Sequence, residues 1–178
     1  MPASFYIKMP VDKEGNRMQK RKGNWLYIMI ALVIIAVDQV VKFRVRDTIP
    51  LFETKPFIPG MMELTYVQNT GAAFSIFSEH TMVLALISAV VAGIILVMLL
   101  RGIVPHPLAQ WSLALVLGGA VGNLIDRIYL GYVVDMFSLQ FINFAIFNVA
   151  DIAVTMGGVL LCVSVLFFWN NKGEDENP

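Results

Sequence analysis

Four long apolar segments dominate the pattern of hydrophobic and polar positions along this chain. Each is close to the roughly 20 residues that an α-helix needs to cross a lipid bilayer. Polar stretches, or turns that contain glycine and proline, separate them. The pattern therefore predicts membrane-spanning helices at 24–44, 80–100, 111–130 and 147–169.

The segment 45–79, between the first two predicted helices, follows a different pattern. It contains three prolines and Gly60, and apolar and polar residues alternate from Met62 to Val67, which is the period of a β-strand. Asn-Thr-Gly at 69–71 suits a turn, so we predict a return strand over 72–77. The expected fold class is an all-α membrane protein with four transmembrane helices and a small β element on the outer face.

The order of these segments predicts one membrane domain, 1–178. The tail at 1–23 is basic and expected to be flexible, 101–110 and 170–178 are expected on the cytoplasmic side, and 131–146 forms an outer loop. This orientation puts eight basic residues inside and five outside, and basic residues favour the inside. Both termini are then cytoplasmic, and Asp38, Asp135 and Asp151 lie toward the outer leaflet.

Composition supports a protein in lipid. Apolar residues make up 57% of the chain and charged residues 15%, whereas a soluble domain has about a quarter charged residues. The net charge is zero, which gives no indication of nucleic-acid binding. The single cysteine, Cys162, excludes an internal disulfide and a multi-cysteine metal site, and we interpret it as a packed thiol.

Polar side chains are concentrated between Gly118 and Gly158. On the third predicted helix, Asn123, Asp126 and Arg127 have i, i+3 and i+4 spacing and share one face, although Asp126 and Arg127 do not face each other. Gly118 and Gly122 form a small-xxx-small seam, which is typical of close helix packing. An ionised side chain within a spanning helix costs about 2.5–3.5 kcal/mol, so these residues require an explanation.

A second polar face lies on the fourth predicted helix, where Asn148, Asp151 and Thr155 have i, i+3 and i+7 spacing. Asp135 lies in the connection before it and can fold back toward Asp151. Two neighbouring carboxyl groups share a proton, so that one acts as a base and the other as an acid. This pair can hydrolyse a peptide bond.

A purely structural role remains an alternative for these residues, since buried ion pairs also fix the register of membrane helices. Against it, three carboxylates and only one arginine lie between Gly118 and Gly158. On the first predicted helix, Asp38 and Lys42 are four residues apart, which predicts an ion pair at the membrane interface. Asp38 has apolar neighbours and could also brace a polar site.

Four blocks of this sequence resemble the lipoprotein signal peptidases, the signal peptidase II family of bacterial aspartyl proteases. They are DQVVK at 38–42, NTGAAFS at 69–75, GNLIDR and VVDM within 122–136, and FNVAD at 147–151. The resemblance implies that Asp135 and Asp151 are the catalytic pair. It also implies binding or supporting roles for a further set: Asn69, Gly71, Asn123, Arg127, Asn148, Asp38 and Asp126.

The family's substrate is a prolipoprotein that carries a diacylglyceryl group on a cysteine and is cut on the amino side of that cysteine. The resemblance therefore implies a prolipoprotein partner, membrane lipid, no cofactor and no metal, in the bacterial inner membrane. We expect a monomer. The alternatives are a small proton-coupled transporter, a serine–lysine protease that uses Lys42 with Ser75 or Ser138, and an assembly scaffold. His80 and His106 are interpreted as isolated loop residues.

Overall fold

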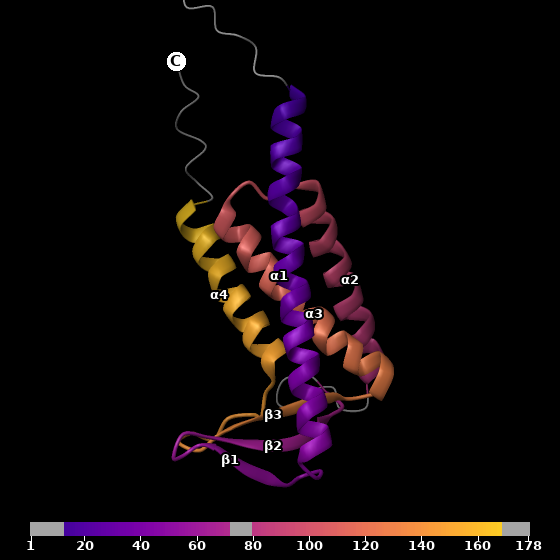
Figure 1. Ribbon diagram of the computed structural model, residues 1–178, viewed down its shortest axis with the longest axis vertical. Coiled ribbons are helices and arrows are strands. Elements are labelled where there is room, and N and C mark those ends of the chain that lie inside the picture. Colours follow the sequence, from indigo (N-terminus) through magenta and orange to yellow (C-terminus); the bar gives the residue numbers. More distant parts are fainter. Residues whose placement is uncertain (1–12, 72–79, 169–178) are drawn as a thin grey trace, which may run out of the picture.

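The computed structural model describes residues 13–71 and 80–168 of the chain (Figure 1). In chain order the elements are α1 (Lys13–Thr48), β1 (Thr54–Ile58), β2 (Met62–Asn69), α2 (Thr81–Arg101), α3 (Pro107–Leu130), β3 (Val133–Leu139) and α4 (Val149–Phe168). The three strands lie at one end of the helices, and the start of α1 and the end of α4 lie at the other end (Figure 1).

All four described helices are long and apolar enough to cross a membrane, as predicted. The candidate spans are Trp25–Thr48, Thr81–Arg101, Pro107–Leu130 and Val149–Phe167. The start of α1 and the end of α4 lie on the same side of the bundle (Figure 1), which is the arrangement that four crossings of a membrane require.

Helix α1 is longer than the sequence pattern predicts. It has 36 residues, which at 1.5 Å per residue is about 54 Å, and it extends in both directions beyond 24–44. The second half of the basic tail, from Lys13, is therefore helical. The first part of that tail lies outside the described residues.

Two helix starts differ from the prediction because of their capping residues. Helix α3 begins at Pro107 rather than at 111, since proline suits the first helical position. The Nδ1 atom of His106 accepts a hydrogen bond from Leu108 N at 3.3 Å, so His106 caps α3 and is not an isolated loop residue. Helix α4 begins at Val149 rather than at 147, because Asn148 caps it.

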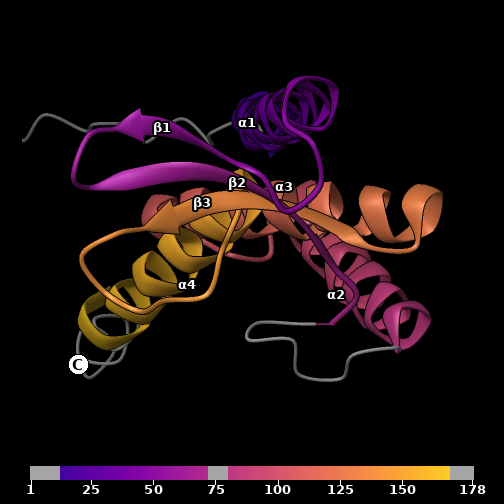
Figure 2. The ribbon, with the colours of Figure 1, turned by 90° about the horizontal axis from the view of Figure 1, so that it is seen from below.

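The strands form one antiparallel sheet in the order β1-β2-β3 (Figure 2). The predicted strand around Glu63 is confirmed as β2. Its hairpin partner, however, is β1 on the amino-terminal side, and the return strand predicted over 72–77 lies outside the described residues. On its other side β2 pairs with β3, which lies within the segment predicted as an outer loop at 131–146. Asp135 is therefore held in a sheet, opposite Val67 of β2.

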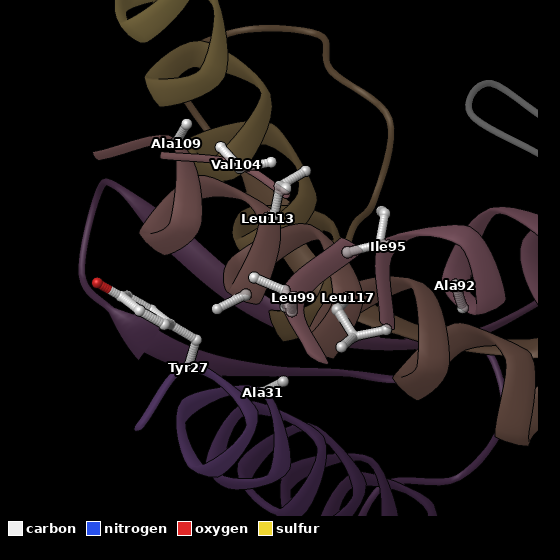
Figure 3. Packing of buried hydrophobic residues seen from close by; sticks show 10 residues of the cluster. Tyr27, Ala31, Ala92, Ile95, Leu99, Val104, Ala109, Leu113 and Leu117 are labelled. Atoms are coloured by element: carbon white, nitrogen blue, oxygen red, sulfur yellow. The ribbon is translucent and has the colours of Figure 1, made fainter. Parts of the chain in front are cut away.

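Two apolar clusters hold this arrangement together. The larger lies among the helices and is built mainly from α1, α2 and α3, with Ala31, Leu99 and Leu117 among its members (Figure 3). The smaller joins the end of α1 to the sheet and contains Val45, Ile49, Tyr66, Val134 and Met136. The second cluster fixes β3, and with it Asp135, against α1.

Small residues let the helices approach closely, as the seam at Gly118 predicted. A Cβ atom on Gly118 would lie 2.8 Å from Ile34 Cβ, so α1 and α3 touch there. The prediction for Cys162 was wrong, because its side chain is exposed on α4. A helix at the edge of a membrane bundle turns apolar residues outward toward lipid, and an apolar run alone does not show which residues these are.

Candidate active site

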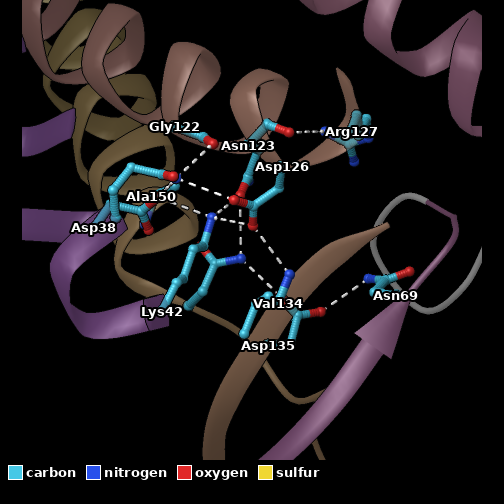
Figure 4. Close-up of polar contacts among 12 residues, drawn as sticks. Asp38, Lys42, Asn69, Gly122, Asn123, Asp126, Arg127, Val134, Asp135 and Ala150 are labelled. Carbon is cyan, nitrogen blue, oxygen red and sulfur yellow. Dashed lines mark hydrogen bonds and ion pairs between the residues drawn. The ribbon is translucent and has the colours of Figure 1, made fainter. Parts of the chain in front are cut away.

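The predicted site residues lie on α1, β2, α3, β3 and α4 or directly beside these elements. Figure 4 shows how several of them, among them Asp38, Asp126 and Asp135, meet where the helices reach the sheet. They form two connected groups. One surrounds the carboxyl groups of Asp135 and Asp151, and the other surrounds the ammonium group of Lys42. Asn123 of α3 belongs to both groups.

Asp151 is part of a capping box at the start of α4. Asn148 Oδ1 accepts a hydrogen bond from Asp151 N at 2.9 Å, and Asp151 Oδ2 accepts one from Asn148 N at 3.1 Å. Asp151 is thus in the first helical turn, where the helix dipole favours negative charge. The i, i+3 spacing of Asn148 and Asp151 therefore has two consequences. It starts the helix, and it holds the carboxylate of Asp151 in a fixed position.

The same asparagine connects the two aspartates. Asn148 Nδ2 donates a hydrogen bond to Asp135 Oδ1 at 2.6 Å. Because Asn148 Oδ1 is occupied by the helix cap, its NH2 group must point away from α4, toward β3. The carboxyl groups of Asp135 and Asp151 are consequently held by one residue, the first by its side chain and the second by its backbone N, as the prediction that Asp135 folds back toward Asp151 requires.

Asp135 is almost completely buried, with an exposed fraction of 2%. Burial and, to a smaller extent, the negative charge of Asp151 raise the pKa of its carboxyl group to about 6, against the hydrogen bonds from Asn69 and Asn148, which lower this pKa. Asn69 Nδ2, from the end of β2, donates to Asp135 Oδ2 at 2.9 Å. Each oxygen of Asp135 therefore has one amide donor.

The second oxygen of Asp151 is also held by an asparagine. Asn123 Nδ2 donates to Asp151 Oδ1 at 2.8 Å, while Asn123 Oδ1 accepts from Asn148 Nδ2 at 3.2 Å. Asn69, Asn123 and Asn148 therefore surround the two aspartates with amide groups. This explains why asparagines accompany the carboxylates in the sequence.

Asp38 and Lys42 form the predicted ion pair, and this pair is buried inside the protein. Lys42 Nζ lies 2.8 Å from Asp38 Oδ2 and 3.0 Å from Asp126 Oδ2, and the exposed fractions of Lys42 and Asp38 are 2% and 0%. The ammonium group also donates to Asn123 Oδ1 at 2.7 Å. An i, i+4 spacing identifies the pair, but it does not reveal that a third helix covers it.

Asp38 and Asp126 also contact backbone amides of other elements. Asp38 Oδ1 accepts from Ala150 N in α4 at 2.9 Å, and Asp126 Oδ2 accepts from Val134 N in β3 at 3.0 Å. The sequence interpretation overlooked Gln39, whose Nε2 donates to Asp126 Oδ1 at 3.0 Å. Its signal was a polar residue within an apolar run.

Gly122 belongs to this polar group as well as to the packing seam. A Cβ atom at Gly122 would lie 2.6 Å from Asp38 Oδ2, and Gly122 O accepts a hydrogen bond from Gln39 Nε2 at 3.1 Å. The prediction that this glycine serves only helix packing was therefore incomplete.

Arg127 points away from Asp126, as its spacing predicted, and contacts the segment after β2. Its Nη2 donates to Gly71 O at 3.2 Å, and Gly71 N donates to Asn69 Oδ1 at 2.9 Å. Within the part of the chain that the structure describes, the buried Nε atom of Arg127 has no hydrogen-bond partner. A buried N–H of this kind is suited to bind an acceptor on another molecule.

The site combines two carboxyl groups with their amide donors, a set that suits acid–base chemistry. Among residues 13–71 and 80–168, no group of three or more His, Cys, Asp or Glu side chains could hold a metal ion. Lys42 donates to three acceptors, so it is not available as the base of a serine–lysine pair; Ser75 lies outside the described residues.

Comparison with known proteins agrees with this geometry. Residues 30–167 match the protein family described as Signal peptidase (SPase) II. The lipoprotein signal peptidase of Streptococcus pyogenes serotype M5 (strain Manfredo) is 42% identical over 159 residues, which cover 87% of this chain and 97% of that protein. The lipoprotein signal peptidase of Lactobacillus johnsonii (strain CNCM I-12250 / La1 / NCC 533) is 40% identical over 142 residues, which cover 80% and 92%.

Two solved structures of bacterial membrane enzymes share the fold. One has a TM-score of 0.78 at 29% identity and covers 86% of this chain and 94% of its own. The other has a TM-score of 0.73 at 28% identity and covers 80% and 94%. With the family match over most of its length, the four-helix chain described above belongs to the signal peptidase II family.

Proposed function

We propose that this protein removes the signal peptides of lipoprotein precursors by acid–base hydrolysis at Asp135 and Asp151. Family membership supports a membrane signal peptidase, and no comparison supports the alternative of a transporter. The assignment of the two aspartates depends on their shared contact with Asn148 and on the raised pKa of Asp135. Asn148 contacts both, and the buried Asp135 has a pKa of about 6 beside the charge of Asp151.

The two carboxyl groups have different environments, which gives them different roles. Asp135 is buried, and its pKa of about 6 lies close enough to neutral pH for the protonated form to be populated and to donate its proton. Asp151 lies at a helix N-terminus with an amide donor on each oxygen, so it is the carboxylate that accepts a proton from water. The water oxygen attacks the scissile carbonyl carbon, and Asp135 protonates the departing nitrogen. No cofactor or metal takes part in this mechanism.

Arg127 and Gly71 are suited to hold the substrate backbone beside the two aspartates. The Nε atom of Arg127 offers a buried donor to a peptide carbonyl, and the hydrogen bond from Nη2 to Gly71 O fixes the orientation of the guanidinium group. Asn69 connects this segment to Asp135. An extended substrate strand bound here would lie along the end of β2.

The substrate that we propose is a precursor already carrying a diacylglyceryl group on its cysteine, cut on the amino side of that residue. Its signal peptide lies in the bilayer and reaches the aspartates sideways from lipid. The excess of basic residues in the predicted cytoplasmic segments supports an outward-facing sheet and active site in the bacterial inner membrane. The amphipathic sheet would then lie at the membrane surface and reduce the access of bulk water.

This proposal is tested with purified protein in detergent and a diacylglyceryl-modified prolipoprotein. We expect the parent to release the signal peptide, and Asp135→Asn and Asp151→Asn each to lose measurable cleavage while eluting as the parent does in size-exclusion chromatography. Mass spectrometry of the product identifies the bond that is cut. A variant that cleaves at the parental rate would show that the substituted aspartate is not part of the catalytic pair.

A further inference from the structure

Lys42 is one of the largest fully buried side chains in the described chain, and the proposed mechanism does not use it. Its ammonium group has three protons, and three acceptors surround it: Asp38 Oδ2 at 2.8 Å, Asp126 Oδ2 at 3.0 Å and Asn123 Oδ1 at 2.7 Å. A buried ion pair contributes little to stability compared with well-packed apolar residues, so its presence calls for another reason.

One branch of this cluster leads to Asp135. Asp126 Oδ2, which contacts Lys42 Nζ, also accepts a hydrogen bond from Val134 N at 3.0 Å. Val134 directly precedes Asp135 and is completely buried. The position of β3 relative to α3 is therefore fixed at the residue next to the carboxyl group (Figure 4).

A second branch leads to Asp151. An ammonium group has donors and no acceptor, so the side chain of Asn123 must turn its oxygen toward Lys42. This orientation leaves Asn123 Nδ2 to face Asp151, to which it donates at 2.8 Å. Without Lys42, the orientation of the Asn123 amide would depend on one longer hydrogen bond, from Asn148 Nδ2 to Asn123 Oδ1 at 3.2 Å.

We infer that Lys42 is a positioning residue, which sets the relative placement of Asp135 and Asp151 through Asp126 and Asn123. The inference depends on the proposed function, because it assigns Lys42 a role in the same reaction. Two short chains of contacts, one to the backbone beside Asp135 and one to a carboxylate oxygen of Asp151, begin at the same atom, Lys42 Nζ. A shift of that atom moves both reacting groups.

Lys42 also acts on the site through its charge, and the two effects must be separated. Asp38 and Lys42 of α1, Asp126 and Arg127 of α3 and Asp151 of α4 are the charged groups around Asp135, and the positive charge of Lys42 lowers the pKa of Asp135. Loss of that charge alone would move the pH profile of the reaction upward. Loss of positioning would lower the rate at every pH.

Three variants separate positioning from charge. Lys42→Met removes the ammonium group, and Asp38→Asn/Lys42→Met also removes one negative charge, which restores the net charge of the cluster. Asp38→Asn alone is the reference for the double variant, and Lys55→Met, at an exposed lysine of β1, is the matched control. The substrate is a synthetic diacylglyceryl-cysteine peptide that spans the cleavage region, and kcat and KM are measured from pH 5 to pH 9.

We expect kcat to fall about 100-fold in Lys42→Met, the effect of misplacing reacting groups by about 1 Å, with KM within about threefold of the parent. The double variant should be slower than the parent by a similar factor, although its cluster has the net charge of the parent, and it should also be slower than Asp38→Asn. Lys55→Met should match the parent. A double variant as fast as the parent would show that Lys42 acts only through charge and would overturn the inference.

Folding is checked by size-exclusion chromatography and thermal unfolding. If Lys42→Met does not fold, the double variant decides the question; if neither folds, Lys42 is a folding determinant and the inference is wrong. A parent and a Lys55→Met protein that both fail to cleave would contradict the proposed function instead. A folded Lys42→Met protein with the parental kcat, beside an active parent, would contradict only the role of Lys42.

Discussion

Replacing Asp135 by asparagine should abolish cleavage and at the same time stabilise the folded protein at neutral pH. Burial and the charge of Asp151 raise the pKa of Asp135 from 3.8 to about 6. The folded state therefore holds the Asp135 proton more tightly than the unfolded state does. As the pH rises from about 4 to about 6, folding comes to require a buried negative charge, and stability falls.

The magnitude follows from the size of the pKa shift. A change from 3.8 to about 6, at 1.36 kcal/mol per pKa unit, corresponds to about 3 kcal/mol of lost stability. This loss is small at pH 4, develops between about pH 4 and pH 6, and is constant above about pH 7. Asparagine carries no charge at any of these pH values, so Asp135→Asn should recover most of the loss at pH 8 and almost none at pH 4.

The assay compares thermal unfolding of the parent and the variant by intrinsic tryptophan fluorescence in detergent from pH 4 to pH 8. We expect Tm of Asp135→Asn to exceed that of the parent by several degrees at pH 8, with a difference that shrinks toward pH 4. Asp126→Asn is the matched control, since Asp126 contacts Lys42. It should be less stable than the parent by about 1.5–3 kcal/mol, because a hydrogen bond to a charged group is lost.

A destabilised Asp135→Asn protein at pH 8 would refute this reasoning. That outcome would mean that the ionised carboxylate contributes to folding, as a buried structural ion pair does, and the structural alternative for Asp135 would then be preferred. A gain in stability on removing a functional group is instead expected where a site is built for chemistry rather than for folding.

Two further substitutions test how the substrate and the two aspartates are held. Arg127→Ala should raise KM by about 10-fold or more, with a smaller change in kcat, because it removes a buried charged donor worth about 1.5–3 kcal/mol; a fall in kcat alone, at saturating peptide, would contradict a binding role. Asn148→Ser should keep the cap of α4, since serine is an equally good capping residue, and so keep Tm within a few degrees, but it should lose most activity because Asp135 loses the amide donor at 2.6 Å. Parental activity in folded Asn148→Ser would show that this bridge is dispensable.

The helices and most of the polar site could be predicted from the sequence because both produce local signals. An apolar run of about 20 residues in lipid has only one good conformation, and a carboxylate in such a run is conspicuous because it is costly. Asn123, Asp126 and Arg127 could be assigned to one side of a helix from spacing alone, and the structure confirms that Asp126 and Arg127 point to different partners.

The sheet could not be derived in the same way, because strand pairing is a long-range property. The alternation around Glu63 identified β2, but the identity of its neighbours depends on contacts with segments before and far after it. The sequence predicts a loop at Asp135 because β3 gives only a weak strand signal. This strand has seven residues, and Val133–Met136 are buried on both faces of the sheet, so apolar and polar residues do not alternate there. The burial of Lys42 cannot be predicted for a related reason, because the residues that cover it belong to α3 and are not apparent from the sequence of α1.

The structure also explains how this many charges coexist in a small membrane protein. Sequence counting between Gly118 and Gly158 gave three carboxylates and one arginine, but the relevant set adds Asp38 and Lys42 of α1. The negative charges of Asp38 and Asp126 are balanced by Lys42 and by hydrogen bonds from the backbone amides of Ala150 and Val134. Arg127 then remains as the cation that acts on both Asp135 and Asp151. One positive charge beside two carboxyl groups is neutral only when one of them holds a proton, and this is the protonation state that the proposed hydrolysis requires.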